Sequence, residues 1–141
     1  MKKLIAFFTL LFVLTLPAVS ADISEADKQN FKSIVTSQLN AFKMDDGAKA
    51  YSYAAPKVTQ IFPNAEIFMT MVQRGYPPVY RNEKFTFGAT TIDQFGRPVQ
   101  HVTIRTGDGK AYEALYAMEL EADGTWKIAG CTLAEIAEIG A

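Results

Sequence analysis

Apolar residues change their spacing along the chain near residue 80. Upstream of Gly75-Tyr76-Pro77-Pro78-Val79-Tyr80-Arg81, they recur every three or four positions, as on one face of a helix, and downstream they alternate, as in a half-buried strand. Pro77 and Pro78 lack backbone N–H donors, and each favours extended geometry in the residue before it. We therefore predict a helical half, a rigid extended crossover at these prolines, and a sheet half.

The helical half contains about three expected helices. The first has an apolar face with helical spacing, formed by Phe31, Ile34, Val35, Leu39 and Phe42. Side chains that can cap a helix precede the expected helices: Asp22 or Ser24, Asp45 or Asp46, and Asn64. Pro56 suits the first position of a short helical turn through Phe62. Gly75 is expected to take the left-handed conformation just after the last helix.

The sheet half shows four extended stretches separated by turn signals. They cover residues 83–93, 97–106, 110–121 and 125–133, with aspartate and glycine residues between them. An Asp-Gly pair between alternating segments is a strong signal for a hairpin. Consecutive strands joined by short turns pair in antiparallel fashion. We therefore predict a four-stranded antiparallel meander.

Alternation assigns the strand residues to two faces of this sheet. The inner face, toward the helices, is expected to hold Phe85, Phe87, Ala89, Val102, Ile104, Tyr112, Ala114, Tyr116, Met118, Leu120, Trp126 and Ile128. The outer face is expected to hold His101, Thr103, Arg105, Glu113, Glu119 and Lys127. Leu115 and Ala117 give this outer face a modest apolar centre. Such a patch is a candidate partner surface, and it predicts a homodimer formed through the outer sheet face.

The first 21 residues have the layout of a secretory signal peptide. Lys2 and Lys3 precede an apolar run from Leu4 to Leu16, and small residues follow up to Ala21. The run is shorter than the roughly 20 residues that span a bilayer. We therefore expect cleavage after Ala21, a single domain over residues 22–141, a periplasmic or secreted location, and no membrane attachment after cleavage.

Charge and cysteine content remove further classes of function. The net charge of −1 becomes more negative when the leader is lost, which argues against a nucleic-acid partner. Cys131 is the only cysteine, so no disulfide can form within the chain. Two interpretations of this thiol stay open: a reactive or intermolecular site, and a small buried side chain on the last strand.

The order of elements resembles the nuclear-transport-factor-two-like superfamily, also called cystatin-like. That resemblance implies an α+β, cone-shaped fold in which about three N-terminal helices pack on a curved four-stranded antiparallel sheet. Several strings of residues carry a more specific likeness within this superfamily: Gln38-Leu39-Asn40-Ala41-Phe42, Tyr53-Ala54-Ala55-Pro56, Phe68-Met69-Thr70-Met71-Val72, Gly75-Tyr76-Pro77-Pro78-Val79-Tyr80-Arg81, Phe87-Gly88, Ala114-Leu115-Tyr116 and Trp126-Lys127-Ile128-Ala129-Gly130-Cys131. In these strings the chain resembles domain-of-unknown-function family 4864. That resemblance implies no activity.

Candidate chemistry is sparse. Tyr112 and Tyr116 supply inward hydroxyls, but the same strand places Glu113 and Glu119 outward, so no interior acid–base pair is expected. His101 is the sole histidine, which excludes a site built from several histidines. We expect no catalytic residue, no metal site and no cofactor.

Tyr80 and Arg81 lie where the crossover meets the sheet half. The guanidinium of Arg81 either grips a ligand carboxylate or anchors the crossover to a helix end or an acidic side chain. With Tyr112, Tyr116 and Trp126, these two residues form the candidate ligand-binding set.

The expected function is that of an exported, non-catalytic module that binds a small apolar ligand or associates with itself. The alternative is a small-molecule isomerase, hydratase or hydrolase that uses a tyrosine-lined pocket in the cone.

The predicted leader makes the N-terminus of the mature protein a direct test. N-terminal sequencing of protein secreted from a host that recognises bacterial export signals should begin at Asp22. A mature protein that retains Met1 would contradict the prediction.

Overall fold

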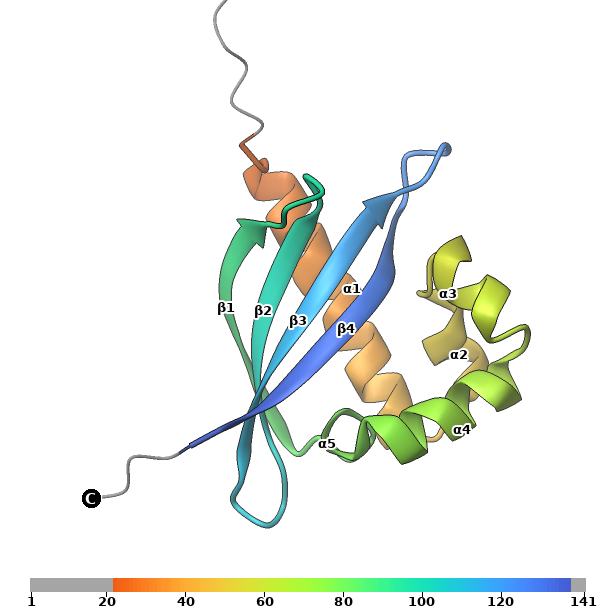
Figure 1. Cartoon of the computed structure of the whole chain (residues 1–141), viewed down its shortest axis with the longest axis vertical. Helices are drawn as coiled ribbons and strands as arrows, with labels where there is room; N and C mark the ends of the chain where they lie inside the picture. Colours follow the sequence, from red (N-terminus) through yellow and green to blue (C-terminus); the bar gives the residue numbers. More distant parts are fainter. Residues whose placement is uncertain (1–21, 138–141) are drawn as a thin grey trace, which may run out of the picture.

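The computed structural model describes residues 22–137 and shows an α+β fold (Figure 1). The predicted leader, residues 1–21, lies outside the described residues. The elements are α1 (Glu25–Lys43), α2 (Gly47–Ser52), α3 (Pro56–Ile61), α4 (Ala65–Gly75), α5 (Pro77–Tyr80), β1 (Lys84–Ile92), β2 (Pro98–Arg105), β3 (Ala111–Leu120) and β4 (Trp126–Ile136). The described chain therefore has five helices, where about three were predicted. None of these helices is long and apolar enough to cross a membrane.

Side-chain caps begin three of the helices as the sequence indicates. Ser24 Oγ accepts a hydrogen bond from the Asp27 amide at 3.1 Å at the start of α1. Asp46, rather than Asp45, caps α2 through the Lys49 amide. Asn64 caps α4. These bonds satisfy amide groups that have no partner within the first turn of a helix.

The expected extended crossover at Pro77 and Pro78 is wrong. The two prolines begin the short helix α5, where the missing N–H donors are not needed because first-turn amides have no partner within the helix. Helix α4 does not continue into them, since it ends at Gly75. Gly75 belongs to α4 and is not among the residues with positive φ, so its predicted left-handed conformation is also wrong.

The four strands form one antiparallel sheet in the order β1-β2-β3-β4, as predicted. Each turn contains a glycine in the left-handed region: Gly96 (φ 77°), Gly109 (φ 83°) and Gly124 (φ 86°). Residues other than glycine rarely adopt this conformation. The first three strands agree with their predicted bounds to within one residue, whereas β4 extends three residues further, to Ile136.

A β-bulge in β1 changes which side chains face inward. Between the pairs Phe87–Val102 and Thr90–Gln100, two residues of β1 oppose His101 alone. The extra residue shifts the alternation, so Ala89 is exposed rather than inward as predicted.

The fully buried Gln100 holds this bulge together. Its Nε2 donates to the carbonyl oxygens of Gly88 at 3.1 Å and His101 at 3.0 Å. Its Oε1 accepts from Thr90 Oγ1 at 2.9 Å. The buried amide group thereby has hydrogen-bond partners in the core. Carbonyl groups are available to it because the bulge interrupts the regular backbone pairing of the strands.

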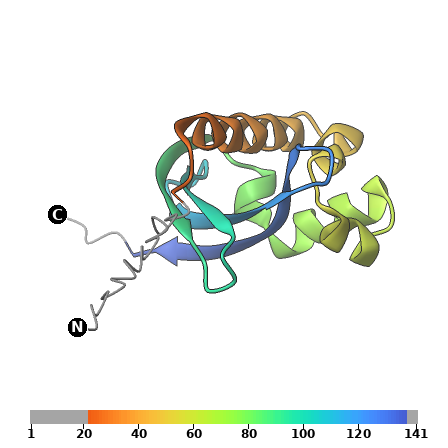
Figure 2. The same cartoon turned by 90° about the horizontal axis from the view of Figure 1, so that it is seen from above.

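Helix α1 lies along the inner face of the sheet, α2 to α4 gather beyond β4 at one end, and α5 lies against α1 and β2 (Figure 2). Phe31 of α1 packs edge-on against Trp126 of β4, with ring centroids 4.8 Å apart. The inner-face residues Val102, Ile104, Ala114, Tyr116 and Met118 are buried as predicted. Leu120 is 54% exposed, contrary to its predicted inward position, because β3 ends there and leads into the turn to β4.

We predict that Gln100→Ala lowers the free energy of unfolding by about 2–4 kcal/mol, because it removes several buried hydrogen bonds and leaves a cavity. Urea denaturation would measure this change. Gln94→Ala, in the exposed turn between β1 and β2, is the matched control and should change stability by less than about 0.5 kcal/mol. Equal stabilities for the two variants would contradict the role of Gln100.

Candidate functional site

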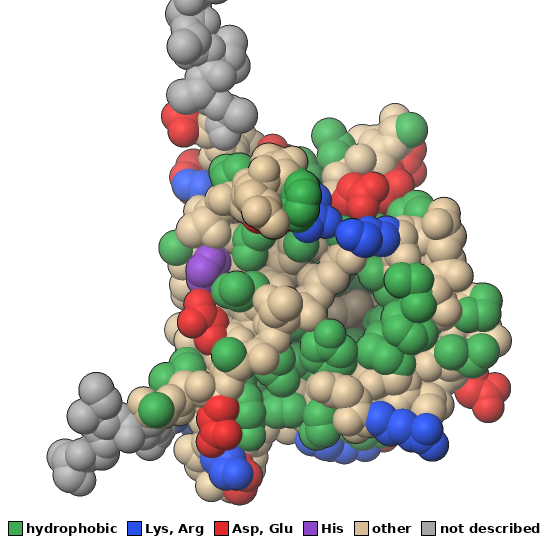
Figure 3. Space-filling model, viewed as in Figure 1, with side chains coloured by type: hydrophobic (Ala, Val, Ile, Leu, Met, Phe, Trp, Pro, Cys, Tyr) green, Lys and Arg blue, Asp and Glu red, His purple; other side chains and the backbone are tan. Residues whose placement is uncertain are grey.

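A pocket of about 350 Å³ opens between β4 and the helices α3 and α4. Figure 3 shows this hollow, bordered by hydrophobic side chains. Most of its wall is apolar or aromatic. The lining residues are Gln38, Phe42, Ala54, Lys57, Val58, Ile61, Phe62, Phe68, Met71, Val72, Tyr76, Val79, Tyr116, Ile128, Ala129, Gly130 and Cys131.

Backbone pairing at the edge of β4 positions the pocket wall. The Ile128 amide donates to the Tyr53 carbonyl at 2.8 Å, and the Ala55 amide donates to the Ile128 carbonyl at 2.8 Å. The segment before α3 is thereby fixed to the sheet edge, and α3 must begin beside β4.

A second bulge directs Cys131 toward the pocket. The pairs Ala117–Gly130 and Met118–Ile128 leave Ala129 as an extra residue in β4. This residue shifts the alternation, so Cys131 becomes the direct neighbour of Tyr116 across the two strands.

The buried end of the pocket contains a hydroxyl group without a partner. Tyr116 is 1% exposed, and its hydroxyl oxygen makes no hydrogen bond with any residue that the structure describes. Burial raises the pKa of Tyr116 well above its usual value of 10. The hydroxyl is therefore neutral at physiological pH, and it is a free donor.

Cys131 is present as a thiol rather than a thiolate. The residue is half-buried overall, but burial of its side chain raises the pKa of the thiol to about 12. Its carbonyl oxygen accepts from the Tyr76 hydroxyl at 3.0 Å. Because thiolates are the nucleophilic form, this side chain is poorly suited to covalent chemistry at neutral pH. This environment fits the interpretation of Cys131 as a small buried side chain on the last strand.

No carboxylate lines the pocket among residues 22–137. Glu113 is exposed and Glu119 half-buried, both on strand positions of the outer face, as predicted. His101 also lies on that face, where its Nδ1 is 2.8 Å from Glu113 Oε1 and its Nε2 is 2.9 Å from Thr91 Oγ1. It therefore faces away from Cys131 and the pocket.

The chain matches one protein family, which is described as a domain of unknown function (DUF4864), over residues 24–140. The chain belongs to this family. No curated protein and no solved structure shows significant similarity to it. Membership in DUF4864 therefore identifies a family without assigning an activity, and the chemistry must be inferred from the residues themselves.

The five candidate ligand-binding residues of this DUF4864 domain do not lie together. Tyr116 alone lines the apolar pocket. Tyr112 lies four residues before Tyr116 on the same face of β3. It pairs with Ile104 and lies outside the pocket wall. Trp126 borders a second hollow of about 420 Å³ between α1, α2 and the turn from β3 to β4.

The second hollow is a weaker candidate because its polar groups already have partners. The Trp126 indole Nε1 donates to Asp27 Oδ1 at 3.1 Å, and Lys127 Nζ donates to the Ser52 carbonyl at 2.7 Å. Asp123 accepts from both the amide and the hydroxyl of Thr125. A ligand there would have to compete with these bonds.

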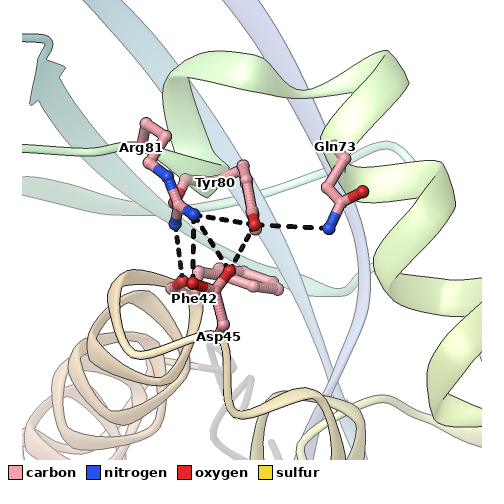
Figure 4. A network of polar contacts seen from close by, with 5 residues as sticks. All are labelled: Phe42, Asp45, Gln73, Tyr80 and Arg81. Carbon is pink, nitrogen blue, oxygen red and sulfur yellow. Dashed lines mark hydrogen bonds and ion pairs between the residues drawn. The ribbon is translucent and has the colours of Figure 1, made fainter.

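Tyr80 and Arg81 form a polar network that joins the helices (Figure 4). Arg81 Nη2 donates to the two carboxylate oxygens of Asp45 at 3.0 and 3.1 Å, and its Nη1 donates to the Phe42 carbonyl at 3.1 Å. The Tyr80 hydroxyl also donates to Asp45, and Gln73 donates to Tyr80. Arg81 thus makes the contacts expected of an anchor between α5 and the C-terminal end of α1.

Asp45 can occupy the centre of this network because of its backbone conformation. Its φ of 54° lies in the left-handed region, which aspartate tolerates better than most residues. Hydrogen bonds lower the pKa of Asp45 below its usual value of 3.8, and the one from Tyr80 has a larger effect than those from Arg81. The carboxylate is therefore ionised at neutral pH and balances the guanidinium.

Of the residues in the pocket wall, the sequence-based candidate set contained Tyr116 alone, and it missed the polar residues Gln38 and Lys57. Gln38 is 4% exposed and donates to the Ala50 carbonyl at 3.1 Å. It lies four positions before Phe42 on the apolar face of α1, and a polar residue in an apolar stripe is a usable signal. Lys57 lies on a short exposed helix, and nothing in its sequence context distinguishes it from other surface lysines.

We predict that Asp45→Asn lowers the free energy of unfolding only at pH values at which the Asp45 carboxyl group is ionised. A carboxyl group whose pKa is lower in the folded state than in the unfolded state stabilises the fold at pH values above its unfolded-state pKa. This stabilisation is lost as the pH falls through the folded-state pKa. Asparagine tolerates the same positive φ, so the substitution tests mainly the charge.

Urea denaturation at about pH 7 and at about pH 2.5, below the usual aspartate range, would measure the difference between wild type and Asp45→Asn. The variant should be less stable at the higher pH, and the gap should narrow at the lower pH. A gap independent of pH would contradict the ionic role.

Proposed function

We propose that this domain binds a small, mostly apolar ligand that carries one hydrogen-bond acceptor, without converting it. The observation that supports this most strongly is the unpartnered Tyr116 hydroxyl in the pocket wall. A buried hydroxyl without a hydrogen bond is costly, and most buried polar groups in proteins have a partner. A ligand carbonyl, ether or hydroxyl oxygen would supply the missing acceptor.

The size and lining of the pocket support a small ligand. Its volume of about 350 Å³ lies at the lower end of the roughly 300–1,000 Å³ typical of small-molecule sites. Such sites combine a predominantly apolar wall with a few polar groups that orient the ligand. Phe42, Phe68 and Val72 provide the apolar wall here, and Tyr116 provides the orienting donor.

The same residues favour binding over the enzymatic alternative. An isomerase, hydratase or hydrolase of this type needs a general base within reach of the substrate. Within the described part of the chain, the pocket has no carboxylate or histidine, and its thiol has a pKa of about 12. The hydroxyl of Tyr116 is a hydrogen-bond donor without a neighbouring base to take its proton.

We infer two further properties from the sequence, which the ligand proposal does not require. The order of helices before a bent sheet supports a cone-shaped fold of the nuclear-transport-factor-two-like type. The leader at residues 1–21 supports export and a site of action outside the cytoplasm. Self-association through the outer face has less support, because Leu115 and Ala117 are already half-buried within the single chain.

We predict that Tyr116→Phe weakens ligand binding without destabilising the fold. The probe is prodan, an uncharged naphthalene dye that carries a ketone oxygen and whose emission shifts to the blue in an apolar site. Loss of one neutral hydrogen bond should lower its affinity by about two- to tenfold. The free energy of unfolding should stay equal or rise by about 1 kcal/mol, because the removed hydroxyl has no partner in the free protein.

Tyr112→Phe is the matched control, since it removes a hydroxyl from the same strand and face but outside the pocket. Prodan titration and urea denaturation of both variants and of wild type would test the proposal. It would be overturned if wild type bound no prodan, or if Tyr116→Phe bound it as tightly as wild type did.

A further inference from the structure

We propose that the ligand of the apolar pocket is an anionic amphiphile, with its charged end at Lys57 and an uncharged chain, which carries the acceptor oxygen for Tyr116, directed inward. This inference rests on the proposed function and specifies the chemical class of the ligand. Two features of the pocket support it. The residues of the pocket wall change from completely buried to exposed, and the one charged side chain that the described residues contribute to the wall is positive.

The pocket wall changes from buried to exposed residues. Tyr116 and Phe42 are each 1% exposed, whereas Ile61 at the rim is 66% exposed. Lys57 is also exposed and lies one helical turn before Ile61 on α3. A charged group is costly to bury without a paired counter-charge. The charged end of an amphiphile must therefore stay at the rim, and only its uncharged part, with the acceptor oxygen, can reach Tyr116.

The charge at the rim selects an anion. Lys57 is the single charged side chain in the pocket wall over the described residues, and no ion pair or hydrogen bond engages its ammonium group there. Figure 3 shows Lys or Arg side chains beside the hollow. A cationic ligand would meet this charge without any carboxylate to compensate it, whereas an anion would be attracted to it.

The exposed apolar surface at the rim provides further contact area. Ile61 is among the large hydrophobic side chains that remain exposed, and it lies in the pocket wall together with Val58 and Phe62. The first carbons of a chain would cover Ile61 while its headgroup stayed beside Lys57. The Lys57 side chain can itself pack along such a chain, because its aliphatic part is apolar and its charge is at the end.

The two contributions to affinity should differ in size. Burial of each additional methylene should strengthen binding by about fourfold, until the chain fills the pocket. The exposed ion pair should contribute no more than about fivefold. Chain length should therefore dominate the affinity, and Lys57 should determine the preference for a carboxylate over an uncharged group.

Competition against bound prodan separates these contributions. The competitors are hexanoate, octanoate and decanoate, together with hexanol, octanol and decanol, at neutral pH and low salt. We expect affinity to rise with chain length in both series, and each carboxylate to bind more tightly than its alcohol. Lys57→Met should weaken decanoate binding by about two- to fivefold and leave decanol binding unchanged. Added salt should reduce the preference for decanoate in wild type but not in Lys57→Met.

Lys49→Met is the matched control. Lys49 is an exposed lysine on the adjacent helix α2 and lies outside the pocket wall. Its substitution should leave both affinities at the wild-type value.

Each other outcome identifies which proposal fails. If wild type binds neither prodan nor any competitor, the proposed function itself is wrong. If prodan and decanol bind but decanoate is not preferred, the pocket stands and the anionic class is overturned. An equal loss of decanoate affinity in Lys49→Met, or a loss of decanol affinity in Lys57→Met, would overturn the assignment of the charge contact to Lys57.

Discussion

The structure depends on the attachment of its helical segment to the edge of β4. Two backbone hydrogen bonds, each 2.8 Å long, join Ile128 to Tyr53 and Ala55. An unpaired strand edge can pair with another chain and promote aggregation, and a segment that covers the edge prevents this. The same attachment places α3 beside the strand, and the Tyr76 hydroxyl continues the cover by bonding the Cys131 carbonyl. The pocket is the space that remains between this cover and the apolar wall of α4.

Much of the fold follows from local signals in the sequence. The caps at Ser24 and Asn64, the left-handed glycines of the three turns and the antiparallel meander all depend on short-range chemistry that a single sequence displays. The two β-bulges do not, because an extra residue in one strand is recognised only when its partner strand is known. The role of Gln100 depends on such a bulge, and so does the inward position of Cys131.

The candidate site could be predicted only in part, for a related reason. Alternation along β3 identifies Tyr116 as inward-facing, but it assigns the same direction to Tyr112. What distinguishes the two tyrosines is the location of the helices, which cover the sheet unevenly and border a pocket whose wall includes Tyr116 but not Tyr112. Tyr80 and Arg81 were chosen for their chemistry and their place at the crossover. In the fold their donors bond Asp45 and the end of α1, because the left-handed turn at Asp45 brings its carboxylate to them.

Burial of the pocket end supports the proposed ligand affinity and accounts for the protonated state of its groups. Low polarity around Tyr116 and Cys131 raises the pKa of each group, so both carry their protons at neutral pH. Such groups cannot act as a base or a nucleophile, but a neutral hydroxyl in an apolar wall is an effective donor because no water competes for its bond. Within residues 22–137, Lys57 is the one charged side chain of the pocket wall, and solvent can still reach it. This separation, with a neutral donor inside and a cation at the rim, suits a molecule that carries an uncharged acceptor in its apolar part and an anionic group at its other end.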